Sequence, residues 1–153
     1  MVANLNDFDV KSHNINVDEL LEIDKWIISK TYSVQSNILE HYKSYEFHQV
    51  IQKIHNFCVN DLGGFYLDVT KDRQYTTQTN SDARRSAQTA INIVLNVMVR
   101  LISPILSFTA EEIWQSQESL KNQYKSVFLS LQYEFSLPKS VLTAENWERV
   151  LEL

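Results

Sequence analysis

Glycine and proline are scarce in this chain, and their scarcity constrains its fold more than any other feature. The 153 residues contain two prolines and two glycines, and the glycines are adjacent at Gly63 and Gly64. Sheets joined by tight turns usually need more of both, because glycine supplies positive φ angles and proline supplies a fixed φ. The sequence therefore predicts an all-α protein, a helical bundle of about one domain with a substantial core.

Apolar residues recur at helical spacing in three long segments and one short segment. The predicted long helices span residues 17–44, 45–75 and 82–104, and a shorter one begins at Thr109. Asn16 and Glu19 form a capping box at the start of the first helix. The two glycines fall inside the second helix, where they predict a kink or a close approach between helices. The buried face predicted for the second helix comprises Phe47, Val50, Ile51, Ile54, Phe57, Cys58, Leu62 and Phe65.

Three regions follow from this pattern. Residues 1–16 are polar and are predicted to form an extended lead-in, and residues 17–118 form the core bundle. Residues 119–153 are predicted to be a connecting segment and the truncated start of a further helical region. Within it, residues 126–133 are expected to be irregular or strand-like. The helical pattern is still running at residue 153, so we expect the chain to be a piece of a longer protein.

Several kinds of site are excluded by composition. Two adjacent glycines cannot form a phosphate-binding glycine loop, and no Glu-x-x-His or G-x-S-x-G motif occurs. His48 and His55 are seven residues apart, about 10 Å along a helix, which is too far to share a metal. Cys58 is the only cysteine, which favours a reducing, cytoplasmic location, and its apolar neighbours predict a buried, unreactive thiol. We therefore expect no catalysis, metal or cofactor in this chain.

The longest apolar region does not predict a membrane span. Residues 90–108 are interrupted every three or four positions by polar residues, namely Asn92, Asn96, Arg100 and Ser103. This spacing places them on one stripe of an amphipathic helix. There is also no basic segment followed by an apolar stretch, so no secretory signal is predicted.

Charge allows nucleic-acid binding only through a local patch, because the net charge is −5. Arg84 and Arg85 lie in the first turns of a predicted helix, where cations are mildly unfavourable and where their planar groups suit phosphate. Alternatively, they form a solvated helix end with Asp82 as partner. Lys71 and Arg73 lie at the end of the second helix, where the helix dipole explains them without any ligand.

Two side chains of the second helix leave the same kind of choice open. His48 and His55 can contact RNA bases, but they can equally be boundary residues of the core. Both lie beside the apolar face of the helix, where histidines are more often boundary residues, and this favours the second interpretation.

Six collinear segments carry a resemblance to a known family. They are ANLNDFD at 3–9, LEIDKW at 21–26, YEFH at 45–48, the run at 55–75, RRSAQT at 84–89 and LISPILSFTAEEIW at 101–114. Together they resemble the helical anticodon-binding region of bacterial isoleucyl-tRNA synthetases. Some elements are shared with the valyl, leucyl and methionyl relatives, so the equivalent domain of one of those enzymes is an alternative.

The resemblance implies a parent enzyme that uses ATP to attach isoleucine to its tRNA. The ATP-binding His-Ile-Gly-His and Lys-Met-Ser-Lys-Ser elements of that class are absent here, as is its cysteine-rich zinc module. ATP and zinc would therefore belong to other domains of the parent. The expected partners of this piece are tRNA(Ile) and the catalytic and C-terminal domains of the same chain, without a membrane.

The resemblance and the chemistry of RNA together suggest seven tRNA contacts. Phosphates are assigned to Arg84, Arg85, Lys71 and Arg73, and contacts near the loop to Phe47, His48 and Ser86. The rival hypothesis is a helical protein-interaction module without an RNA role, in which these basic residues are only solvated.

Overall fold

The structure, a computed structural model, describes residues 1–78 and 80–139, and these residues form helices without any strand. The α-helices are α1 (Val10–His13), α2 (Glu22–Lys43), α3 (Phe47–Asn56), α4 (Leu67–Tyr75), α5 (Asp82–Ile102), α6 (Ser107–Ser116) and α7 (Glu118–Lys121). A π-helical segment, η3 (Phe57–Tyr66), joins α3 to α4, and 3-10 turns form η1 (Val2–Leu5), η2 (Val17–Glu19) and η4 (Val127–Leu129). The predicted all-α fold is confirmed.

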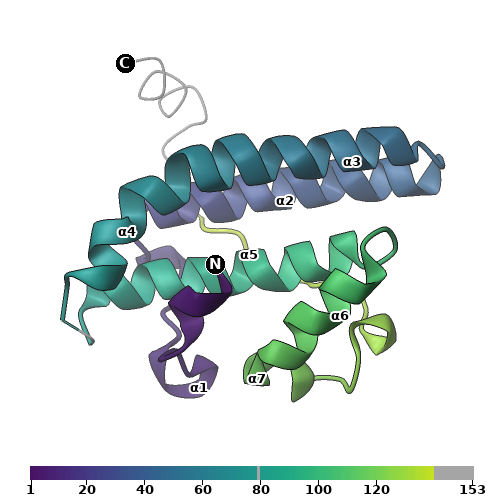
Figure 1. The fold of residues 1–153 in the computed structure, drawn as a ribbon. Coiled ribbons are helices and arrows are strands. Elements are labelled where there is room, and N and C mark those ends of the chain that lie inside the picture. Colours follow the sequence, from purple (N-terminus) through teal and green to yellow (C-terminus); the bar gives the residue numbers. More distant parts are fainter. Residues whose placement is uncertain (79, 140–153) are drawn as a thin grey trace.

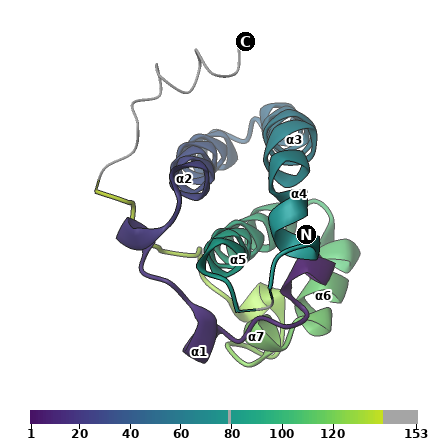
Figure 2. The ribbon, with the colours of Figure 1, turned by 90° about the vertical axis from the view of Figure 1, so that its left-hand side faces the viewer.

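The helices are arranged around α5. Helices α2 and α3 lie side by side as a hairpin along one flank of α5, and α6 and α7 lie on its other side (Figure 1). The end-on view shows α2, α3 and α5 as three neighbouring rods (Figure 2). Every residue of α5 from Arg85 to Leu101 is buried. Helix α5 is therefore the centre of the core.

The polar stripe predicted on α5 faces protein instead of solvent. The guanidinium of Arg100 donates hydrogen bonds to Asn96 Oδ1 and Gln123 Oε1, each at 2.9 Å. It also lies over the rings of Trp114 and Tyr133, at 4.8 and 5.1 Å from their centroids. Gln123 and Tyr133 belong to the chain that follows α7, so Arg100 attaches that chain to the core.

The N-terminal segment differs from the predicted extended lead-in. It forms η1 and α1, which pack on α5, and Asp9 caps α1 by accepting a hydrogen bond from Lys11 N at 3.1 Å. Asn16 is also a cap, but of the short turn η2, and α2 begins five residues later than predicted. The delay has a cause at Leu21, whose N–H donates to Ser86 Oγ at 3.0 Å and holds the backbone extended.

The irregularity predicted at the two glycines is the π-helix η3. A Cβ atom at Gly64 would lie 2.9 Å from the carbonyl oxygen of Val59, five residues earlier, and one at Gly63 would lie 3.1 Å from that of Cys58. The close approach therefore comes from the helix's own backbone and not from a neighbouring helix. Glycine fits these positions because it has no Cβ.

The π-helix also shifts the buried face of this long helical segment. A π-helix has more residues per turn than an α-helix, so the fully buried positions after Phe57 are Leu62 and Tyr66. The predicted Phe65 is half-buried and packs edge to face on Trp26, with ring centroids 5.2 Å apart. Contrary to prediction, Ile51 is exposed. Cys58 is exposed as well, although partial burial raises the pKa of its thiol.

The region predicted to be irregular or strand-like contains the turn η4 and then irregular backbone as far as residue 138. Glu111 of α6 accepts hydrogen bonds from Ser126 Oγ at 2.8 Å and from Val127 N at 3.0 Å. Farther along, the amide of Gln35 donates to Tyr133 O at 3.0 Å, which attaches this region to α2. The irregular alternative is confirmed, and the helix predicted from about residue 143 lies outside the described residues.

No helix in the described part of the chain is long and apolar enough to cross a membrane.

Candidate nucleic-acid interface

The first two predicted contacts, Arg84 and Arg85, have partners within the protein. Arg84 pairs with the carboxylate of Asp7 at 2.9 Å, and Arg85 donates to Asp7 O at 3.0 Å and to Gln88 Oε1 at 2.7 Å. Their side chains are 19% and 8% exposed. Partial desolvation acts to raise the pKa of Asp7, but hydrogen bonds from Gln88 and Arg84 and the two positive charges outweigh it, so the pKa is lowered. The carboxylate that pairs with both arginines is therefore that of Asp7, and not that of Asp82.

Two further predicted contacts belong to a buried network around Asp24, which is fully buried. The Asp24 carboxylate accepts hydrogen bonds from Ser86 Oγ and from Tyr66 OH, each at 2.6 Å, and from Arg73 Nη1 at 3.1 Å. Burial, together with the charge of Asp24, raises the pKa of Tyr66 well above its ordinary value. This network joins α2, the η3–α4 segment and α5.

The remaining three predicted contacts are exposed, but they do not lie together. Lys71 lies on α4 and pairs with Asp68 at 2.8 Å. Phe47 and His48 begin α3, at the opposite end of the bundle from α4 (Figure 1). The structure therefore brings Arg73 and Ser86 together at Asp24 and Arg84 and Arg85 together at Asp7, but not all seven residues. Contact of these residues with tRNA stays a prediction.

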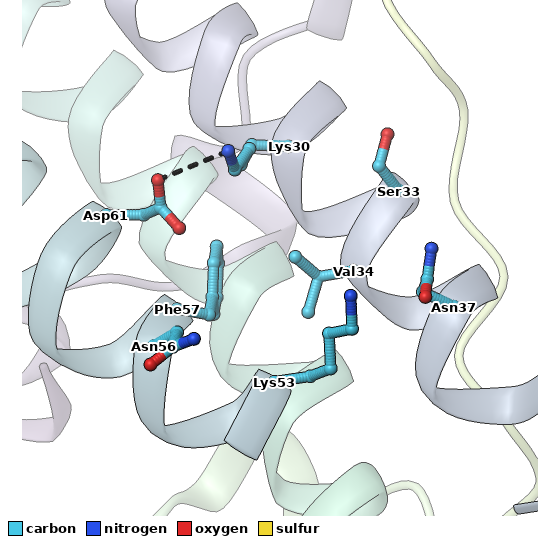
Figure 3. A pocket seen from close by; sticks show the side chains of 8 residues that line it. All are labelled: Lys30, Ser33, Val34, Asn37, Lys53, Asn56, Phe57 and Asp61. Atoms are coloured by element: carbon cyan, nitrogen blue, oxygen red, sulfur yellow. Dashed lines mark ion pairs between the residues drawn. The ribbon is translucent and has the colours of Figure 1, made fainter. Parts of the chain in front are cut away.

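A different surface gathers polar side chains from two helical segments. A groove of about 270 Å³ lies between α2 and the α3–η3 segment (Figure 3). It is lined by Lys30, Ser33, Val34, Asn37, Lys53, Asn56, Phe57 and Asp61. The fully buried ring of Phe57 lies between the two walls. We call this surface the hairpin groove.

The charges of the hairpin groove are only partly neutralised. Lys30 Nζ lies 3.4 Å from Asp61 Oδ1, and the Lys53 side chain extends toward Val34 across the groove (Figure 3). Lys53 makes no ion pair with any residue in the described ranges. Amines, amides and a hydroxyl are the donors that bind RNA phosphates and ribose hydroxyls. The groove therefore presents donors of the kinds that an RNA backbone binds.

Sequence reasoning missed the polar residues of the groove because they lie outside the apolar faces of the two long helical segments. One signal was available: Asn37 lies in the exposed part of α2, and Asn56 is the last residue of α3. Asparagine is a poor helix former, so its use in a helix indicates a role for the side chain.

Among the described residues, no group of three or more His, Cys, Asp or Glu side chains could hold a metal ion.

A helical hairpin packed on a buried central helix, with polar donors along the hairpin, fits a class of RNA-binding domain. The chain matches the family described as the anticodon-binding domain of tRNA ligase over residues 24–153, and it belongs to that family. The resemblance found in the sequence is thereby confirmed.

The chain is similar to several proteins named isoleucine–tRNA ligase. It is 54% identical over 134 residues to the one from Ruthia magnifica subsp. Calyptogena magnifica, which covers 88% of this chain and 14% of the relative. It is 46% identical over 155 residues to the one from Dichelobacter nodosus, covering 100% and 17%. It is also 46% identical over 154 residues to isoleucine–tRNA ligase 1 of Pseudomonas fluorescens, covering 99% and 16%. The chain thus spans about one-sixth of the length of these relatives.

Proposed function

We propose that this chain is the part of an isoleucine–tRNA ligase that binds the anticodon stem-loop of tRNA(Ile). The family match and the names of the relatives support the class of ligand. The structural observation that carries the proposal is the hairpin groove, where the Lys53 amine lies beside amide and hydroxyl donors and has no carboxylate partner among the described residues.

The geometry suggests how the RNA is held. The minor groove of an A-form stem displays phosphates and 2′-hydroxyls, which suit Lys53 and the amides of Asn37 and Asn56. Phe47 lies six residues before Lys53, about 9 Å along the helix, so a strand bound in the groove reaches the hairpin turn with its next nucleotides. The stem then occupies the groove, and the loop lies at the turn.

The rest of the reaction belongs to the parent protein. Attachment of isoleucine to tRNA with ATP takes place, in this proposal, on a separate catalytic domain in the cytoplasm. The anticodon-binding domain described here positions the tRNA for that step, and the catalytic and C-terminal domains are its covalent neighbours. ATP and zinc are assigned to those domains.

A fluorescence-anisotropy titration with the labelled stem-loop of tRNA(Ile) tests the proposal. Lys53→Gln should weaken binding several-fold and reduce the slope of log affinity against log salt by about 1, because one phosphate contact is lost. Lys125→Gln is the matched control, since Lys125 is also exposed and has no ion pair within the described part of the chain, but lies outside the groove.

Three results separate the alternatives. Wild-type protein that fails to bind the stem-loop at low salt overturns the proposal and favours the protein-interaction module. Equal losses for the two variants overturn the hairpin groove as the site. Equal affinity for stem-loops of isoleucine and valine tRNA would leave RNA binding standing but remove selectivity from this domain.

A further inference from the structure

The turn between α2 and α3 has a tyrosine where glycine is the usual residue. Tyr45 follows the C-cap residue Ser44, and its φ of 60° makes it the only non-glycine residue with positive φ in the described chain. Its N–H donates to Tyr42 O at 3.2 Å, and the N–H of Glu46 donates to His41 O at 2.9 Å. This pattern is a Schellman motif, whose left-handed position favours glycine or asparagine because a Cβ is unfavourable there.

The strained residue presents its ring to solvent. Tyr45 is 78% exposed and Phe47 is 47% exposed. Burial of the Tyr45 ring therefore does not compensate for the backbone conformation. A bulky residue held in this region of φ is an outlier that directs attention to function.

The exposed rings are fixed in place by contacts beneath them. The Tyr45 and Phe47 rings meet edge to face with centroids 6.0 Å apart, and Phe47 meets Tyr42 in the same way at 6.2 Å. The Tyr42 hydroxyl donates to Leu101 O at 2.7 Å, which connects the rings to α5. Glu46 accepts from His41 Nδ1 and Ser44 Oγ, each at 2.9 Å, and so rigidifies the turn.

The charge around the turn favours an RNA base over an apolar protein segment. Lys43 is exposed and, among the described residues, has no ion pair, and the carboxylate of Glu46 is engaged within the turn. His48 is exposed beside Phe47. Stacking on aromatic rings accepts any base, and nearby cations bind its phosphate.

We propose that Tyr45 and Phe47 form a stacking platform for an unpaired base of the bound RNA loop. The inference rests on the proposed function and adds a base-binding site at the hairpin turn. The left-handed backbone at Tyr45 makes its ring project outward from the turn. If the helix continued through Tyr45, the ring would instead lie along the helix surface.

The experiment uses two variants and two RNA probes. Tyr45→Gly removes the ring and relieves the backbone, and Tyr45→Phe keeps both the ring and the backbone conformation. The probes are the stem-loop of tRNA(Ile) with 2-aminopurine in its loop and a fully paired RNA duplex without a loop. Thermal unfolding is measured in parallel, because Tyr45→Gly should melt no earlier than wild type.

Tyr45→Gly should bind the stem-loop about tenfold more weakly and lose the quenching of 2-aminopurine that stacking causes. Tyr45→Phe should retain both signals, and the affinity of all three proteins for the duplex should be the same. Stem-loop binding by Tyr45→Gly equal to wild type, while Lys53→Gln remains impaired, would overturn the platform and leave the proposed function intact. No binding of either probe by wild type would overturn both.

Discussion

At the scale of single residues, the cations that the sequence makes most conspicuous have internal partners. Arg84 and Arg85 enclose Asp7, and Arg73 reaches Asp24. Each pair joins segments that are far apart in the chain, between 49 and 78 residues. A buried carboxylate with three donors is costly to disrupt, because loss of one donor leaves its charge incompletely compensated. These residues therefore fix the relative positions of helices.

Removal of the Tyr66 hydroxyl tests how much the hydrogen bonds to buried Asp24 contribute to the free energy of unfolding. Tyr66→Phe removes one hydrogen bond to the buried Asp24 charge and should lower the free energy of unfolding by about 1.5–3 kcal/mol. Tyr75→Phe is the matched control, because its hydroxyl donates to Asn4 Oδ1 at the surface and its loss should cost less than about 1 kcal/mol. Urea unfolding of the two variants gives the comparison, and equal costs would contradict the special role of Asp24.

A variant of Ser86 can distinguish a structural role of this residue from a role in RNA contact. Ser86→Ala removes a donor to Asp24 and the acceptor of the Leu21 N–H, so it should destabilise the protein by about 2 kcal/mol. Its affinity for the stem-loop, measured well below the unfolding temperature, should equal that of wild type because Ser86 is buried. A weakened affinity of the fully folded variant would restore Ser86 as a tRNA contact.

Sequence reasoning could identify the cations at the helix ends but not their partners. Asp7 and Arg84 are 77 residues apart, and no periodicity connects them. The groove residues were hidden for a different reason, since lysine and asparagine on a polar helix face look the same whether or not a second helix lies opposite.

At the scale of helices, apolar periodicity predicted the type of each element well, but it predicted less well which residues of each helix face the core. Helix α5 begins at Asp82 as predicted, because Ser81 caps it through a hydrogen bond from Arg84 N. In the second long segment Leu62 is buried as predicted, but beyond it Tyr66 is more deeply buried than Phe65, because a π-helix changes the number of residues per turn. Two adjacent glycines indicated an irregularity there, but propensity does not distinguish a kink from a π-helix.

The attachment of the irregular chain to α5 can be tested through Arg100. Arg100→Lys keeps the charge but loses the planar fork that reaches Asn96 and Gln123 and stacks between two rings. Hydrogen exchange should become faster in residues 123–135, while the α2–α3 hairpin should exchange as in wild type. Uniform acceleration across the chain would instead indicate that Arg100 supports the whole core.

At the scale of the whole molecule, the stability of this acidic chain depends in part on carboxylates that the fold keeps ionised. The pKa values of five of them lie below their ordinary values, namely Asp7, Asp9, Asp18, Glu46 and Glu111. As the pH falls, the unfolded chain binds protons before the folded protein does. The stability contributed by these groups is therefore full above their ordinary pKa values, 3.8 for Asp and 4.5 for Glu, and is lost as the pH falls through the folded values.

Asp7→Asn tests this dependence. The variant should be less stable than wild type at pH 7, because Arg84 and Arg85 lose their carboxylate partner. The difference should shrink below pH 4 as Asp7 becomes protonated in wild type. Urea unfolding at a series of pH values between 3 and 7 measures both curves, and parallel curves would contradict the assignment.

The central place of α5 has a consequence for synthesis on the ribosome. The hairpin formed by α2 and α3 is complete at Asn56, yet the helix against which it packs ends at Ile102. At about 5–20 residues per second, translation leaves the hairpin without its support for about 2–9 s. During that interval the apolar face of the hairpin is exposed and available to chaperones. Slow codons between the codons for Asn56 and Ile102 would therefore lengthen this exposure.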